Sequence, residues 1–538
     1  MPLQYSAMAA LASFGLGVLF ICVFSHWRTV AQFASSFWGV IGGLMLGATV
    51  WQMALTGETL EFNLSEVIKT ITLAVHVDYF SIFFLGLLSV VVLVSFIYAV
   101  LSRTSRSLIV DGFVHVLFAA SALAMMASNI FFLFIALGLW IAAAAVLALF
   151  GEGDQLRKLS WFFLVAVGGV GVWIVGLLSL ALPWQSLYLG ALATYASQTS
   201  IDVALLASIT TFLGGLLLWW SERFFHVASR LRSLWQAVLL IVVPAFILRS
   251  FLFFIPGVSL WFGVMVIASA LLLLLGEMLY AYHRQRPLNY FQMLFPGLLI
   301  LLGLFLFGLH GGLAALISVM SIVLYFFLPV AVLLVLLAPW LDNVYLRIAN
   351  TVIKVVVGFH MVTLLIPAFV YMLTAIEDRT WRLAMLAVLC SLVALVYLAC
   401  CLNYPSKRWW VRLAHHQLSF QLQPADILTG VVSVALLLVA IVPGLLLQYL
   451  GVYTASFLGL TGNAIEATWW KYTIGLSSPG DTIQIAFILV MVALCSFLVY
   501  GFGLSDKPEV VEPSETPLPS GPENSTTLHG TILGTFLL

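Results

Sequence analysis

Four ionisable side chains lie inside or at the edges of long apolar segments, and they are the residues of this sequence that could do chemistry: Arg249, Glu277, Lys354 and His360. Charged groups are costly in a lipid bilayer and persist there where they pair with each other or carry ions. A series of such groups could pass a proton from one to the next. No Ser/His/Asp, Cys/His or metal-ligand spacing accompanies them, so the sequence indicates no intrinsic catalysis, cofactor or metal site.

The chain must be a membrane protein, because 63% of its 538 residues are hydrophobic and only 8% are charged, with a mean hydropathy of +1.15. We count about fifteen apolar runs of the roughly 20 residues that cross a bilayer as a helix. Of the 21 Lys and Arg, 14 lie in the gaps after odd-numbered runs. These residues are Arg28, Arg103, Arg106, Arg157, Lys158, Arg223, Arg230, Arg232, Arg284, Arg286, Arg347, Lys407, Arg408 and Arg412.

Short basic loops remain in the cytoplasm. The charge pattern therefore predicts a multi-pass protein of the inner (cytoplasmic) membrane with its N-terminus outside. We expect crossings to start near Ser6, Phe33, Asp78, Asp111, Asn129, Trp161, Ile201, Leu234, Val258, Asn289, Gly311, Thr351, Leu383, Asp426 and Asp481. Residues 1–504 would form the transmembrane domain. Residues 505–538, rich in Pro, Glu, Ser and Thr, would form a disordered cytoplasmic tail.

This topology places Glu277 and Lys354 near the cytoplasmic ends of their helices, where opposite charges at equal depth could pair. His360 follows Lys354 by six positions, about 9 Å deeper in the membrane, and Arg249 lies toward the outer end of its helix. One interpretation is a cytoplasmic half-channel that runs from Glu277 through Lys354 to His360. The other is that Lys354 snorkels to the headgroups, Glu277 sits at the interface, and His360 bonds a neighbouring helix.

Other features of the sequence limit the protein's partners. The formal net charge is zero, so nucleic acid is not indicated, and the lipid bilayer is the obvious surroundings. The segment 56–77 is too polar to span, and its alternation of polar and apolar residues favours an external β-hairpin or a short strand. The pairs Gly168-Gly169 and Gly214-Gly215 favour close packing of helices.

Several stretches resemble the antiporter-like membrane subunits of respiratory complex I, group 4 membrane hydrogenases and multi-subunit sodium/proton antiporters. Asp78–Phe84 resembles the start of the family's third helix, and Asn129–Phe134 resembles the start of its fifth. Ile247–Leu252 resembles the end of the eighth helix, and the segment 283–317 resembles the loop between the ninth and tenth helices with the apolar run that follows it. These stretches resemble in particular the large membrane subunit of hydrogenase-4 and formate hydrogenlyase. The resemblance implies an all-α bundle of about 14–15 helices with inverted repeats, and other membrane subunits as partners.

Members of this family move protons or sodium along buried glutamate, lysine and histidine residues. At the corresponding positions this chain has residues that cannot take up a proton near neutral pH: Gly138, Trp219, Ile241, Ser318, Ile322 and Phe326. The resemblance therefore implies a subunit of a proton- or ion-translocating, complex I- or hydrogenase-like assembly whose own ion path is degenerate and whose role is structural or coupling. Two alternatives remain: an active proton or cation transporter subunit, and a flippase or polymerase of lipid-linked sugars.

Overall fold

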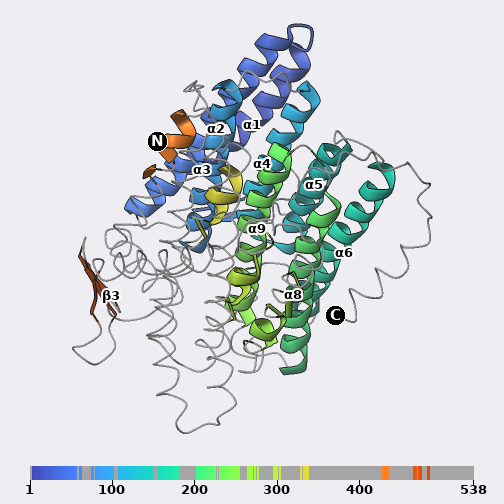
Figure 1. The fold of residues 1–538 in the computed structure, drawn as a ribbon, viewed down its shortest axis with the longest axis vertical. Helices are drawn as coiled ribbons and strands as arrows, with labels where there is room; N and C mark the ends of the chain where they lie inside the picture. Colours follow the sequence, from blue (N-terminus) through green and yellow to red (C-terminus); the bar gives the residue numbers. More distant parts are fainter. Residues whose placement is uncertain are drawn as a thin grey trace, which may run out of the picture.

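The architecture is a bundle of long apolar helices with two small accessory sheets, seen in a computed structural model (Figure 1). The structure describes residues 3–56, 60–63, 74–77, 79–101, 107–149, 155–181, 201–225 and 229–254, with shorter stretches in 263–337, 427–435 and 465–484. Eight helices in these parts are long and apolar enough to cross a membrane. The expected multi-pass membrane bundle is confirmed.

The eight helices follow the expected order of crossings. Each expected start, from Ser6 to Leu234, lies within six residues of the observed one. The helices are α1 (Leu3–Val23), α2 (Arg28–Thr56), α3 (Tyr79–Leu101), α4 (Leu108–Met125), α5 (Ile130–Leu149), α6 (Gln155–Ala181), α8 (Ile201–Ser221) and α9 (Ser229–Phe254). Where α5 begins, the side-chain oxygen of Asn129 accepts a hydrogen bond from the Phe132 amide at 2.6 Å, which satisfies one of the free N–H groups of the first turn.

The helices form two groups that share one apolar core. The first contains α1 to α4, in which α2 packs against α1 and α3, and α1 against α4. The second contains α5, α6, α8 and α9, with its most extensive contact between α6 and α8. Contacts of α4 with α5 and of α3 with α9 join the groups. Large apolar side chains on the outer faces, such as Phe33, Trp51 and Leu164, are exposed, as a lipid-facing surface requires.

Glycine lets α6 and α8 approach each other, as the paired glycines predicted. A Cβ atom on Gly214 would lie 2.7 Å from the carbonyl oxygen of Gly169, and one on Gly169 would lie 2.9 Å from that of Gly214. Neither backbone could retreat without separating the helices. The expected contact role of Gly169 and Gly214 is therefore confirmed, and a Cβ on Gly168 would meet nothing within 4 Å.

The expected β-hairpin is confirmed by β1 (Leu60–Asn63) and β2 (Ala74–Val77), which pair antiparallel. The amide of His76 also donates to the carbonyl of Met126 at 2.9 Å, so the hairpin is attached to the connection between α4 and α5. Val75 and Val77 are buried while His76 is half-buried, which matches the alternation in the sequence.

A second sheet in the C-terminal part was not expected from the sequence. Strands β3 (Ile465–Thr468), β4 (Lys471–Ile474) and β5 (Thr482–Gln484) form an antiparallel meander in the order β3-β4-β5. The expectation that a last crossing starts near Asp481 is therefore wrong at its start, because residues 482–484 are paired in a strand. The expected tail at 505–538 lies outside the described residues.

A candidate charged site at the junction of α8 and α9

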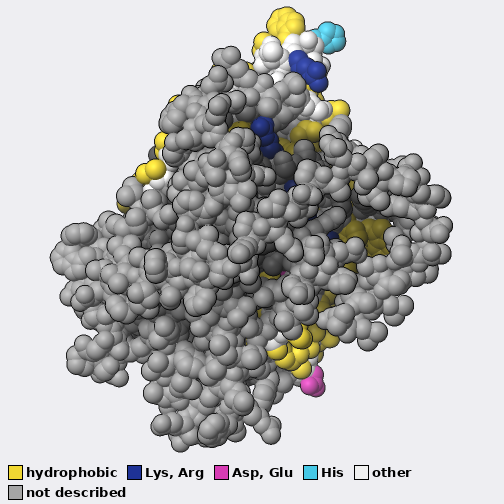
Figure 2. All heavy atoms as spheres, viewed as in Figure 1, with side chains coloured by type: hydrophobic (Ala, Val, Ile, Leu, Met, Phe, Trp, Pro, Cys, Tyr) yellow, Lys and Arg dark blue, Asp and Glu magenta, His cyan; other side chains and the backbone are white. Residues whose placement is uncertain are grey.

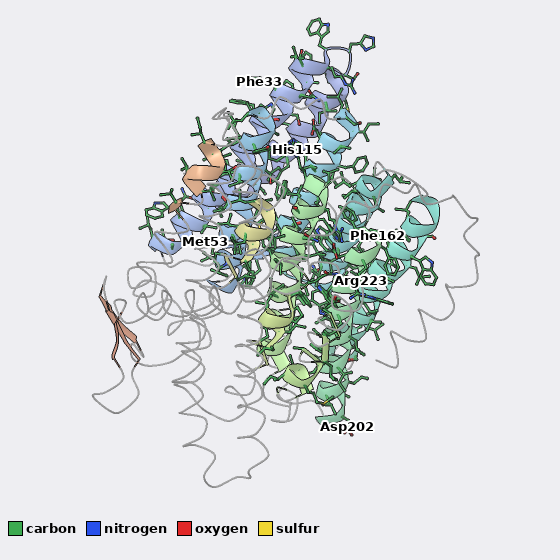
Figure 3. The ribbon with its side chains drawn as sticks, in the orientation of Figure 1. Phe33, Met53, His115, Phe162, Asp202 and Arg223 are labelled. Carbon is green, nitrogen blue, oxygen red and sulfur yellow. The ribbon has the colours of Figure 1, made fainter. Side chains whose placement is uncertain are left out.

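Two buried carboxylates and their cationic partners gather where α8 ends and α9 begins. After Ser221 the chain makes one 3-10 turn, η3 (Glu222–Phe224), and then starts α9 at Ser229. This tight reversal brings the side chain of Glu222 against the first two turns of α9. Figure 3 labels Arg223 and Asp202 at opposite ends of α8, so the site lies at one end of the helix pair.

Glu222 is held by three nitrogen atoms. Its Oε1 accepts hydrogen bonds from Nε of Arg232 at 2.7 Å and from Nε2 of Gln236 at 2.6 Å, and it forms a salt bridge with Nη2 of Arg232, also at 2.7 Å. Arg232 and Gln236 are four residues apart and therefore lie on one face of α9. Glu222 is buried, so these charge-assisted bonds replace the water that its carboxylate would otherwise bind.

The side chain of the next residue, Arg223, pairs with a different helical segment, the one that contains Glu277. Its Nη2 contacts Oε1 of Glu277 in a salt bridge between residues 54 positions apart. The Glu277 side chain is 2% exposed and the Arg223 side chain 30% exposed. The second oxygen of Glu277, Oε2, is buried and has no hydrogen-bond partner among the described residues. Consecutive residues of η3 thus connect the end of α8 to α9 and to the following helical segment.

An aromatic layer closes the site on the side of α5 and α6. The ring of Trp235 on α9 lies 4.5 Å from that of Trp140 on α5, 5.7 Å from that of Phe162 on α6 and 5.1 Å from that of Phe225. Trp219, one turn before the carboxylates, stacks on Phe295 at 5.1 Å. These rings form an apolar layer beside the two carboxylates, while the side chains of Arg223 and Arg232 remain partly exposed.

Further contacts bring other helix ends to the same side of the bundle. The guanidinium of Arg230 lies 5.3 Å from the centre of the Tyr98 ring, near the C-terminal end of α3, a cation–π distance. Trp161, near the start of α6, stacks on Phe224 at 6.3 Å. Figure 2 shows Lys and Arg side chains toward the upper end of the described surface and an acidic side chain at the lower end. The C-terminal end of α3, the start of α6 and the junction of α8 and α9 therefore lie at the same end of the bundle.

The structure brings only part of the expected ion-path set into this site. Glu277 is present, and its partner among the described residues is Arg223; the expected pairing with Lys354 stays a prediction. Lys354 and His360 lie outside the described residues. Arg249 lies on α9 five residues after Pro244, far along the helix from Arg232, and its side chain is outside the description.

Glu222 and Gln236 are functional-site residues that the sequence reasoning missed. A signal was present: Glu222 is an acid in a gap that is otherwise basic, and Arg232 and Gln236 follow at helical spacing. The sequence analysis used this gap only as one of the basic connections that set the topology. Among the described residues no group of three or more His, Cys, Asp or Glu side chains could hold a metal ion.

Of the positions that the resemblance aligned with an ion relay, Gly138, Trp219 and Ile241 are among the described residues, and Ser318, Ile322 and Phe326 lie outside them. Gly138 is on the exposed face of α5, where a Cβ atom would meet nothing within 4 Å. The buried face of α5 is formed by residues such as Leu137, Trp140 and Ile141. Trp219 and Ile241 are buried. Gly138 therefore does not occupy an inward position, yet the inward positions of α5 also carry no ionisable group.

Comparison with solved structures identifies this fold in three membrane complexes. The structure of the membrane-bound sulfane sulfur reductase, an archaeal respiratory membrane complex, contains a chain that matches with a TM-score of 0.62 and 14% identity, covering 99% of this chain and 91% of that one. A chain of the Mrp complex from Dietzia sp. DQ12-45-1b matches with a TM-score of 0.64 and 14% identity. The match covers 93% of this chain and 56% of the Mrp chain.

A chain of respiratory complex I from Thermus thermophilus with bound NADH matches with a TM-score of 0.60 and 17% identity, covering 85% of this chain and all of that one. No protein-family model matches the sequence, and no curated protein matches it. At these identities the likeness establishes the fold, which is that of membrane chains in multi-subunit complexes. Function has to be argued from the residues of this chain.

Proposed function

We propose that this chain is a membrane subunit of a proton- or cation-translocating assembly, in which its first-repeat ion path is closed and its role is structural or coupling. The observation that carries this proposal is the filling of the space between α5, α6, α8 and α9. Trp140 contacts Trp235 across it, Trp173 contacts Phe246 with centroids 4.5 Å apart, and α6 meets α8 at glycine backbones.

The spacing of ionisable groups supports the same conclusion. Between Asp202 and Glu222 the 19 residues of α8 carry no ionisable side chain, a length of about 30 Å. Helix α5 has no ionisable residue at all, and α9 has none between Arg232 and Arg249. A proton needs a connected series of titratable groups or water to cross such a distance, and tightly packed apolar side chains offer neither.

The active transporter is the second candidate, and Glu277 is the observation that favours it. A buried carboxylate with one unbonded oxygen is a group of the kind that ion paths use. Lys354 and His360 would have to continue the path from there. The flippase or polymerase gains no support from the matched complexes, which are two respiratory complexes and an Mrp complex.

The proposal is tested by proton flux through the purified full chain in liposomes under an imposed pH gradient, read with an enclosed pH-sensitive dye. The expected leak equals that of liposomes without protein, and addition of a protonophore confirms that the gradient exists. Flux that is abolished by Glu277→Gln, Lys354→Ala or His360→Ala would establish the transporter instead.

Membership of an assembly needs its own test. Solubilised native membranes separated by native electrophoresis should carry this 59.0 kDa chain in a band of several-fold greater mass, together with other membrane subunits identified by mass spectrometry. Migration as a single chain under conditions that keep a known respiratory complex intact would overturn the subunit role.

A further inference from the structure

The two carboxylates at the junction of α8 and α9 differ in how they could accept a proton. Oε1 of Glu222 contacts three nitrogen atoms of Arg232 and Gln236. Protonation would weaken these charge-assisted bonds, which are about twice as strong as neutral ones. Glu277 receives Arg223 on Oε1 alone, and its Oε2 is buried and unbonded within the part of the chain that the structure describes.

A proton on Oε2 of Glu277 would leave the Arg223 contact in place, because the carbonyl oxygen of a neutral carboxyl group still accepts a hydrogen bond from a guanidinium. It would also remove an unsatisfied negative oxygen from a buried environment, where an unsatisfied polar group costs about 1–3 kcal/mol and a charged one more. The uptake is balanced simply: hydronium gives its proton to Oε2, an O–H bond forms, and water is released.

We propose that Glu277 is a proton-binding site that exchanges protons with the solution at the basic end of the bundle. Arg223 is 30% exposed and connects the buried carboxyl to that solution. The other described charged groups beside it, Glu222 and Arg232, already pair with each other. Helix α5 carries no ionisable group, and α8 carries none between its first-turn Asp202 and Glu222, so neither offers a group next to the site that could take the proton deeper.

The site extends the proposed function without depending on it, because binding a proton at one end requires no conduction to the other. A closed interior would make Glu277 a reporter of pH on one side of the membrane. Its protonation would weaken the Arg223 salt bridge to a hydrogen bond from the charged guanidinium to a neutral carboxyl group, and that contact joins the end of α8 to the next helical segment.

The test is infrared difference spectroscopy of the full chain in lipid nanodiscs during a pH titration. The wild type should gain a protonated-carboxyl band as pH falls, and Glu277→Gln should remove that band. Glu222→Gln is the matched control, since it lies in the same site on the neighbouring residue and should leave the band unchanged. A band that persists in Glu277→Gln, or one that only Glu222→Gln removes, would overturn the assignment.

Carbodiimide labelling of the wild type keeps the proposal testable if either variant fails to fold. An apolar carbodiimide reacts with protonated, buried carboxyl groups, and peptide mass spectrometry locates the adduct. Glu277 should be labelled more at low pH than at high pH, and Glu222 should remain unlabelled. Absence of label on Glu277 at every pH would refute the proton-binding site. It would not change the interpretation of the liposome flux experiment, which tests the proposed function separately.

Discussion

Glu222 and Arg223 are neighbours in sequence, but their side chains pair with different helices: Glu222 with Arg232 on α9, and Arg223 with Glu277 beyond it. One 3-10 turn therefore ties three successive membrane segments together at one end of the bundle. The arrangement concentrates buried charge where the chain reverses, and the middle of α5, α8 and α9 carries no ionisable side chain.

Loss of the Glu222 carboxylate should destabilise this junction. Removal of one partner of a buried ion pair costs about 3–5 kcal/mol, and because the Arg232 side chain is 39% exposed and can reach water, we expect Glu222→Ala to fall at the lower end of that range. Asp202→Ala, an exposed acid at the other end of α8, is the control and should change stability by less than about 0.5 kcal/mol. Denaturant unfolding in detergent micelles measures both, and equal losses would contradict a special role for Glu222.

The contact between Trp140 and Trp235 should carry much of the packing between α5 and α9. Truncation of a buried tryptophan to alanine costs about 3–5 kcal/mol, so Trp235→Ala should lower the unfolding temperature clearly. Trp27→Ala removes a tryptophan that is 65% exposed and should have little effect. Differential scanning fluorimetry measures the unfolding temperatures of the two variants and the wild type. A similar decrease in unfolding temperature for both variants would mean that Trp235 is not a core residue.

Substitution to alanine should destabilise the protein at Gly214 of α8 but not at Gly168 of α6. Gly214→Ala forces a Cβ against the Gly169 carbonyl oxygen at 2.7 Å, and overpacking of this kind costs about 1–3 kcal/mol. Gly168→Ala meets nothing within 4 Å, and should be neutral or stabilise by up to about 1 kcal/mol because alanine favours the helix. Thermal unfolding of the matched pair measures this difference; a stable Gly214→Ala variant would show that the helices are farther apart.

Gly17 on α1 gives room to the buried His115 on α4. A Cβ on Gly17 would lie 2.4 Å from Cε1 of that ring, whose Nε2 lies 2.8 Å from the Ser35 hydroxyl. Gly17→Ala should therefore destabilise the contact between α1 and α4, and Gly15→Ala, with nothing within 4 Å, should not. The double variant Gly17→Ala/His115→Ala should be more stable than the sum of the single effects predicts. Additive effects would show that the two residues do not meet.

The orientation of the chain can be measured directly. From the 14 basic residues in odd-numbered gaps, we expect the N-terminus outside and the tail after about residue 505 in the cytoplasm. A fluorescent reporter that folds only in the cytoplasm should be active when fused after Leu538, and a periplasmic phosphatase should be inactive there. The reverse result would mean an even number of crossings, or a reversed chain.

The sequence alone determined that the chain crosses the membrane repeatedly, where the first eight crossings begin, and which helix ends carry positive charge. It also predicted a β-hairpin or a short strand within 56–77 and close packing of helices at the paired glycines, and the structure shows β1 paired with β2 and Gly169 against Gly214. These properties are local: a bilayer requires about 20 apolar residues per helix, and a strand alternates its side chains between two faces.

Only the tertiary structure decided which face of each helix looks inward and which distant charges meet. Helix α5 is apolar on all sides, because lipid and protein interior are equally apolar surroundings, so its sequence could not show that Gly138 faces outward and Trp140 inward. The partner of Glu277 is 54 residues away, and the burial of Glu222 depends on where α9 packs. Pairing energies between such residues arise only after the helices assemble. For this reason, depth in the membrane alone could not identify Arg223 as the partner of Glu277 among the described residues.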